Sequence, residues 1–174
     1  EFRRVLFRSA LNNSGNMVLV TGNPGQTDAV NRTAGMKSAF KDVGANINVL
    51  AEQTGKWSKD EALKVMTTFL TKYPKIDAVF GHDDPMALGA LEAINASGRT
   101  GIKVFGVNGN KEACQSIKDG KMFGTALQLS YLVGVYAVRA AYDLKMGRLI
   151  SSQTLAPTAP VTPENIDTWF SQCW

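Results

Sequence analysis

Residues 76–90 read IDAVFGHDDPMALGA, an apolar segment that meets a helical pattern across a polar turn. The residues predict a strand over Ile76–Phe80 and a helix that begins at the turn. Asp84 is expected to cap this helix, with Pro85 at the first helical position, where the missing N–H of proline costs nothing. The next strand, Ile102–Phe105, is also followed by a polar segment, Gly-Val-Asn-Gly. In an open parallel sheet, such strand ends form the edge where ligands bind.

Strands and helices alternate along the rest of the chain. Further strands are expected at Met17–Thr21, Ile47–Ala51 and Phe123–Leu127. Helices are expected over about residues 26–43, 58–73, 84–98, 111–119 and 131–146. Five strand–helix units with short turns predict an α/β fold, a doubly wound parallel sheet with right-handed crossovers. Residues 159–166 in the tail are expected to begin as an extended segment.

The composition is that of a globular domain, with 44% hydrophobic and 20% charged residues among 174. The formal net charge of +4 falls to +2 without residues 1–9, which carry three Arg and one Glu. Residues 1–9 look like the translation of a sequencing-library adapter, so we expect them to lie outside the fold. No basic stripe with interleaved aromatic residues occurs, which argues against nucleic-acid binding by this segment. No run approaches 18 apolar residues, so no transmembrane helix is expected.

The sequence predicts neither a metal site nor a cofactor. The turn at residues 22–27, Gly-Asn-Pro-Gly-Gln-Thr, lacks the Gly-Lys-Ser/Thr ending of a Walker loop and the GxGxxG spacing of a dinucleotide site. Cys114 and Cys173 have no CxxC spacing and no neighbouring histidine, so a zinc or redox site is not expected. The two cysteines allow at most one internal disulfide, and unpaired or structural thiols are the favoured interpretation.

Five side chains at or near strand ends are candidates for ligand binding: Arg32, Trp57, Asp83, Asn108 and Gln128. A guanidinium donates several hydrogen bonds to ring and hydroxyl oxygens, although Arg32 could instead pair with Asp28 one helical turn earlier. Trp57 either packs on the helix that follows or presents its face to a sugar ring. Asp83, Asn108 and Gln128 can accept hydrogen bonds from hydroxyl groups, although each also suits a turn or a strand end.

His82 is the one histidine of the chain. A general base needs a substrate proton within reach and a group that orients it. No nucleophile is evident near His82 in the sequence, so a histidine satisfied by its neighbours is the favoured interpretation. An α/β enzyme that uses His82 and Asp83 as acid–base groups is the alternative from a different functional class, and loss of an activity in His82→Ala would support it.

The order of these residues resembles that of the ribose-type (type I) periplasmic sugar-binding proteins, over about residues 15–168. The resemblance rests on the segments Asn31–Met36, Asp83–Ala90, Gly106–Gly109, Ile117–Lys121 and Thr125–Gln128. It implies that the five candidate residues contact the ligand. The family usually has Asn where this chain has Asp83, and Asp where it has Asn108. One carboxylate and one amide are therefore kept with their places exchanged, which fits a sugar without selecting ribose.

The resemblance covers only the C-terminal half of these two-lobe proteins. It implies that residues 10–128 form the C-terminal lobe, and that a helix in residues 129–150 packs on an N-terminal lobe absent from this sequence. Residues 151–174 then form a return segment and tail. The helix is apolar around much of its circumference, so it is expected to be buried on more than one side. Without the other lobe it would expose an apolar patch.

By resemblance, the whole protein is the substrate-binding protein of an ABC importer and not an enzyme. Its partners would be a monosaccharide and the membrane permease, and the complete protein is expected to be monomeric. It would be periplasmic, or lipid-anchored outside the membrane in a Gram-positive source. The alternative is the effector domain of a lactose-repressor-family transcription regulator, whose DNA-binding helix-turn-helix would lie upstream.

Overall fold

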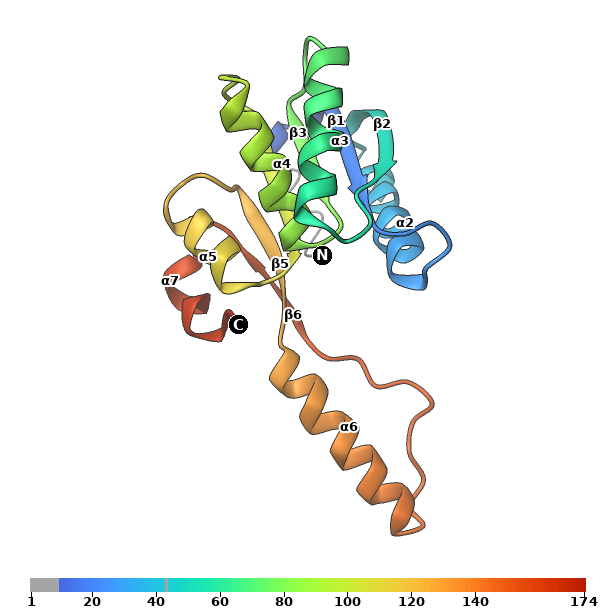
Figure 1. Ribbon diagram of the computed structural model, residues 1–174. Coiled ribbons are helices and arrows are strands. Elements are labelled where there is room, and N and C mark those ends of the chain that lie inside the picture. Colours follow the sequence, from blue (N-terminus) through green and yellow to red (C-terminus); the bar gives the residue numbers. More distant parts are fainter. Residues whose placement is uncertain (1–9, 43) are drawn as a thin grey trace.

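The computed structural model describes residues 10–42 and 44–174 (Figure 1). Within these ranges the strands are β1 (Ser14–Thr21), β2 (Asn46–Thr54), β3 (Ala78–Gly81), β4 (Lys103–Asn108), β5 (Gly124–Gln128) and β6 (Thr158–Val161). The helices are α2 (Thr27–Asp42), α3 (Lys59–Lys72), α4 (Asp84–Ala96), α5 (Lys111–Lys118), α6 (Ser130–Lys145), α7 (Ile166–Trp169) and the 3₁₀ helix η1 (Phe170–Gln172). The predictions for residues 1–9 and for Val43 fall outside the described residues.

The strands form one sheet in the order β2-β1-β3-β4-β5-β6. The first five strands are parallel, which confirms the predicted doubly wound α/β fold. The extended tail segment becomes β6, which pairs antiparallel with β5. The order reverses between β1 and β3, and the crevice at such a switch point is where open α/β sheets bind ligands.

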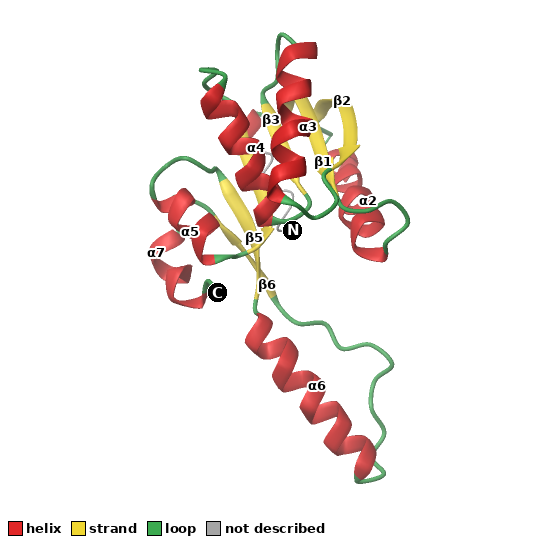
Figure 2. Ribbon diagram, in the orientation of Figure 1, coloured by secondary structure: helices red, strands yellow, loops and turns green. Residues whose placement is uncertain are grey.

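Helices cover both faces of the sheet, and β1 shows how the chain serves both layers (Figure 2). Met17 and Leu19 belong to the apolar cluster beneath α2, whereas Val18 and Val20 belong to the cluster beneath α3 and α4. All four side chains are fully buried. Successive side chains of a strand point to opposite faces, so a strand that is apolar throughout must lie between two layers.

The two predicted helix starts had different outcomes. Ser58 caps α3 as expected, because its hydroxyl accepts a hydrogen bond from the backbone N–H of Glu61 at 3.4 Å. The prediction that Asp84 caps α4 is wrong. Asp83 has the extended backbone of a cap, and its Oδ1 accepts a hydrogen bond from the N–H of Met86 at 2.8 Å. Asp84 is already helical, and its carboxylate bonds instead to the turn after β4.

A disulfide joins Cys114 of α5 to Cys173, which follows η1. Unpaired thiols are therefore the wrong interpretation of the two cysteines. The bond holds the end of the tail against α5. The backbone of Trp174 also pairs with the turn after β4, since its N–H donates to Gly109 O at 3.2 Å and its carbonyl accepts from Lys111 N at 2.7 Å.

Helix α6 extends away from the sheet (Figure 1), and none of its residues is buried. Its apolar side chains lie in solvent, among them Tyr131, Val133, Val135, Val138, Tyr142 and Leu144. This confirms the exposed apolar patch expected for this helix. No helix among the described residues is both long and apolar enough to cross a bilayer.

Candidate ligand-binding site

Four of the five predicted residues meet at the carboxyl-terminal edge of the sheet. Asp83 follows β3, Asn108 ends β4, Arg32 reaches this edge from α2, and Trp57 reaches it from the loop before α3. The four segments are drawn together because β1, β3 and β4 are neighbouring parallel strands that end side by side. These four residues bring one cation, one carboxylate, one amide and one indole to the edge.

Arg32 connects the strand ends to one another. Its guanidinium donates a hydrogen bond to the backbone carbonyl of His82 and another, at 3.3 Å, to Oδ1 of Asn108. The Arg32 Cζ atom also lies 5.6 Å from the centre of the Trp57 ring, within the range of a cation–π contact. The side chain thus faces the strand ends, as the ligand-binding interpretation requires.

Trp57 packs on the turn between β1 and α2. Its indole Nε1 donates a hydrogen bond to Oε1 of Gln26, a contact that sequence reasoning missed. The ring lies so close to Gly22 that a Cβ atom there would come within 1.9 Å of it. Glycine at position 22 therefore makes room for the indole. Trp57 itself has a left-handed backbone, with φ of 60°, which is uncommon for a bulky residue.

His82 lies beneath these side chains and is fully buried. Its Nδ1 accepts a hydrogen bond from the backbone N–H of Gly22 at 3.1 Å, and its Nε2 lies 3.0 Å from the Thr33 hydroxyl. Burial, and then the positive charge of Arg32, lower the pKa of His82 from 6.5 to about 4. The imidazole is neutral at pH 7 and both nitrogens have partners, which confirms the prediction of a satisfied histidine.

Asp83 is a buried carboxylate at the centre of the edge. Burial raises its pKa, while the hydrogen bond from Met86 N–H and the charge of Arg32 act in the opposite direction. One carboxylate oxygen serves the helix cap. Arg32 therefore bonds to the Asn108 amide and acts on the Asp83 carboxylate through its charge.

Asn108 and Gln128 complete the edge. Asn108 has a φ of 126° and Gly109 a φ of 84°, so the backbone turns through left-handed conformations after β4, as Asn-Gly predicts. Asn108 is the register partner of Leu127 in β5. Gln128 therefore lies one residue beyond Asn108, on the next strand. It is partly exposed, and its backbone is the register partner of Thr158 in β6.

Sequence reasoning missed the role of Asp84, whose buried carboxylate holds the turn after β4. Its Oδ2 accepts hydrogen bonds from the N–H groups of Gly109 and Asn110, both at 2.7 Å. The signal in the sequence is Gly106, because a Cβ atom at that position would come within 2.2 Å of Asp84 Oδ1. A glycine in the middle of a buried strand often marks such a close approach.

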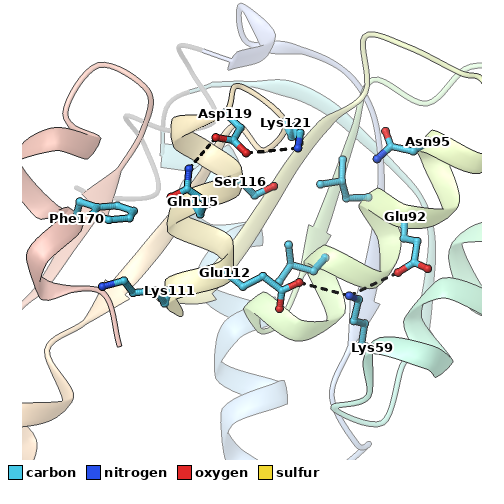
Figure 3. A pocket seen from close by; sticks show the side chains of 12 residues that line it. Lys59, Glu92, Asn95, Lys111, Glu112, Gln115, Ser116, Asp119, Lys121 and Phe170 are labelled. Atoms are coloured by element: carbon cyan, nitrogen blue, oxygen red, sulfur yellow. Dashed lines mark hydrogen bonds and ion pairs between the residues drawn. The ribbon is translucent and has the colours of Figure 1, made fainter.

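A separate open groove of about 660 Å³ lies between α3 and α4 on one side and α5 and η1 on the other (Figure 3). Three lysines and three acidic side chains line it, and most of them form ion pairs. Lys59 lies 3.6 Å from Glu92 and 3.5 Å from Glu112, and Lys121 lies 3.4 Å from Asp119. The groove therefore does not concentrate charge of one sign. Among the described residues, no group of three or more His, Cys, Asp or Glu side chains could hold a metal ion.

Comparison with known proteins agrees with this fold. Residues 6–149 match the model of the periplasmic binding protein domain family. The chain is 35% identical, over 157 residues, to the ribose import binding protein of Bacillus subtilis. This alignment covers 90% of the chain and 50% of the relative. The chain therefore spans about half the length of the relatives it matches.

Solved structures agree as well. One is an ABC transporter periplasmic solute-binding protein from Actinobacillus succinogenes with bound D-allose, at 28% identity and a TM-score of 0.89 over 96% of this chain and 58% of that chain. Another is a solute-binding protein from Bacillus halodurans with bound myo-inositol, at 28% identity and a TM-score of 0.88 over 97% and 58%. The chain belongs to the periplasmic binding protein domain family.

Proposed function

We propose that this chain is the C-terminal part of a two-lobe solute-binding protein of an ABC importer, and that a monosaccharide binds at the carboxyl edge of its sheet. The observation that carries the proposal is the convergence of Arg32, Trp57, Asp83 and Asn108 on that edge. The names of the relatives and of the solved structures add support, since they refer to ribose, D-allose and myo-inositol.

The chemistry of the edge suits a neutral ligand rich in hydroxyl groups. Arg32 supplies donors to ring and hydroxyl oxygens, and Asp83 supplies acceptors for hydroxyl protons. Trp57 offers an aromatic face to the apolar side of the ring, and Gln128 adds an amide at the next strand. His82 is neutral and engaged at both nitrogens. This arrangement favours binding over chemical conversion, so the proposal includes no enzymatic activity.

The second half of the site would come from another lobe. Residues 10–128 form the lobe described above, residues 129–150 contain the helix that packs on the other lobe, and residues 151–174 return to the sheet. Closure of the two lobes around the sugar would bury it, and a membrane permease would recognise the closed form. The complete protein is then a monomer outside the cytoplasmic membrane, either periplasmic or lipid-anchored.

The direct test uses the complete gene, obtained by sequencing the source locus upstream of Ala10. The encoded two-lobe protein is titrated calorimetrically with D-ribose, D-allose and myo-inositol beside the 174-residue chain. We expect a measurable heat of binding for the two-lobe protein and weak or no binding for the chain. Micromolar binding by the chain would contradict a shared site. An upstream helix-turn-helix would assign the chain to a transcription regulator.

Two substitutions test the edge itself in the two-lobe protein. Arg32→Ala and Asn108→Ala each remove hydrogen bonds to the ligand, one of them charged, so each should weaken sugar affinity by about 10–100-fold. Lys37→Ala is the matched control, because Lys37 lies on the same helix and pairs with Glu52 at the surface. Its affinity should equal that of the wild type. Unchanged affinity in both edge variants would place the site elsewhere.

A further inference from the structure

Asp84 lies beneath the ligand edge, with its side chain buried. It is the first residue of α4, and its carboxylate spans three segments of the chain. Oδ2 accepts from the N–H groups of Gly109 and Asn110 in the turn after β4, and Oδ1 accepts from the Thr125 hydroxyl of β5 at 2.6 Å. One side chain therefore ties the start of α4 to the turn after β4 and to Thr125 near the start of β5.

The backbone above Asp84 needs such a support. Asn108 has a left-handed φ of 126°, and a residue other than glycine keeps this conformation when its surroundings impose it. Asp84 supplies hydrogen bonds to the two N–H groups that follow Asn108. Gly106 leaves the space that the carboxylate occupies. Gly106 of β4 and Asp84 at the start of α4 therefore fit together at this contact.

Burying the ionised Asp84 carboxylate costs free energy of folding. Burial raises the pKa of Asp84 to about 6, although the bonds from Thr125, Asn110 and Gly109 each act to lower it. The charge of the neighbouring Asp83 raises it further, and Arg32 acts in turn on Asp83. A residue needed for packing alone would be better replaced by an apolar one, because a buried charge is a poor source of stability.

We propose that Asp84 is a positioning residue for the ligand site: it holds the turn at Gly109 and Asn110, and thereby sets the Asn108 amide against Arg32. The inference rests on the proposed function only in its last step, the contact between Asn108 and the sugar. The first step, the hold on the turn, is a property of this chain and is tested without a ligand.

Amide NMR of the 174-residue chain tests the hold on the turn. An amide proton bonded to a carboxylate shifts when that carboxylate titrates, so the Gly109 and Asn110 resonances should move with pH at one common midpoint. In Asp84→Asn an amide oxygen can still accept from both N–H groups, so both should stay protected from exchange and cease to titrate. In Asp84→Ala both should exchange about 10–100-fold faster.

Asp77→Ala is the matched control. The Asp77 carboxylate also accepts from a backbone N–H, that of Asn16 at 2.7 Å, but at the opposite edge of the sheet. The variant should leave the Gly109 and Asn110 resonances in place. Independent or absent titration of these two amides in the wild type would overturn the proposal. If Asp84→Ala does not fold, a titration that persists in Asp84→Asn would overturn it equally.

Sugar affinity of the two-lobe protein tests the last step. Asp84→Ala should weaken binding by about 10–100-fold, as loss of the Asn108 contact would, and Asp84→Asn should restore most of it. Wild-type affinity in Asp84→Ala would overturn the positioning role. Absence of sugar binding in the wild type would contradict the proposed function instead. The hold of Asp84 on the turn, measured by the amide titration, would be unaffected.

Discussion

At the scale of single residues, His82 and Asp84 make opposite contributions to the dependence of stability on pH. The pKa of His82 is lowered on folding, so its contribution to stability is present above its ordinary pKa of 6.5 and is lost as pH falls toward about 4. The pKa of Asp84 is raised on folding, so its contribution is present below its ordinary value of 3.8 and is lost as pH rises through about 6. Between about pH 4 and 6 the two terms offset each other.

Asp84→Asn should therefore reveal the His82 term. Between pH 6.5 and 4.5 the free energy of unfolding of the variant should fall by about 2 kcal/mol more than that of the wild type, since one pKa unit corresponds to about 1.4 kcal/mol. Urea unfolding across this range measures the difference. The double variant Asp84→Asn/His82→Gln should regain a flat profile. Parallel profiles for the wild type and Asp84→Asn would contradict the opposing terms.

The position of the candidate site was predictable from the sequence, but the separate roles of Asp83 and Asp84 within it were not. Apolar runs that end in polar residues locate Asp83 and Asn108 at one edge of a parallel sheet, whatever the details of packing. The choice of cap between Asp83 and Asp84 depends on where the N–H groups of Gly109 and Asn110 lie, about 25 residues further along the chain. Both aspartates suit a helix start locally, so a reading of local preferences could not separate them.

At the scale of elements, the tail is attached to the turn that carries Asn108. The Cys114–Cys173 disulfide closes a separation of 59 residues, and Trp174 pairs with Gly109 and Lys111 through its backbone. Sequence spacing could not predict this bond, because two cysteines so far apart meet only once α5 and the tail are folded together. The antiparallel pairing of β6 was equally hidden, since the segment that precedes it has no pattern that sets its direction.

Reduction of the disulfide should destabilise the chain by about 2–4 kcal/mol, because the unfolded state regains the freedom of a long loop. Thermal unfolding with and without a reductant measures the loss as a lower Tm. The double variant Cys114→Ser/Cys173→Ser is the control, and its Tm should not respond to the reductant. An unchanged Tm for the wild type, with both thiols shown to be free, would contradict a stabilising bond.

At the scale of the whole molecule, α6 is a helix without a packing partner among the described residues. Val133, Val138 and Tyr142 are more than half exposed. Replacing all three with Gln should raise the concentration at which the 174-residue chain aggregates, and should change its stability by less than about 1 kcal/mol. Light scattering and thermal unfolding measure the two effects. In the two-lobe protein the same variant should lose several kcal/mol of stability, as large buried side chains do when replaced.

Val30→Gln is the matched control for this experiment. Val30 is also about half exposed, but it lies on α2, away from the apolar patch. Its substitution should leave the aggregation of the chain unchanged. If Val30→Gln improves solubility as much as the α6 variant does, then any added polar side chain on the surface explains the effect and α6 is not a packing surface. Equal stability of the α6 variant and the wild type in the two-lobe protein would lead to the same conclusion.

Because β5 pairs with β6, the segment between them, which contains α6, can be deleted without breaking the sheet. Gln128 and Thr158 are register partners in an antiparallel ladder, so the chain leaves the sheet and re-enters it at one point. Two strands in this relation can be joined by a two-residue turn such as Asn-Gly. Everything between them is, in topological terms, the loop of a hairpin. The sheet with its candidate ligand edge, its disulfide and its tail could thus be rebuilt as a shorter module for engineering.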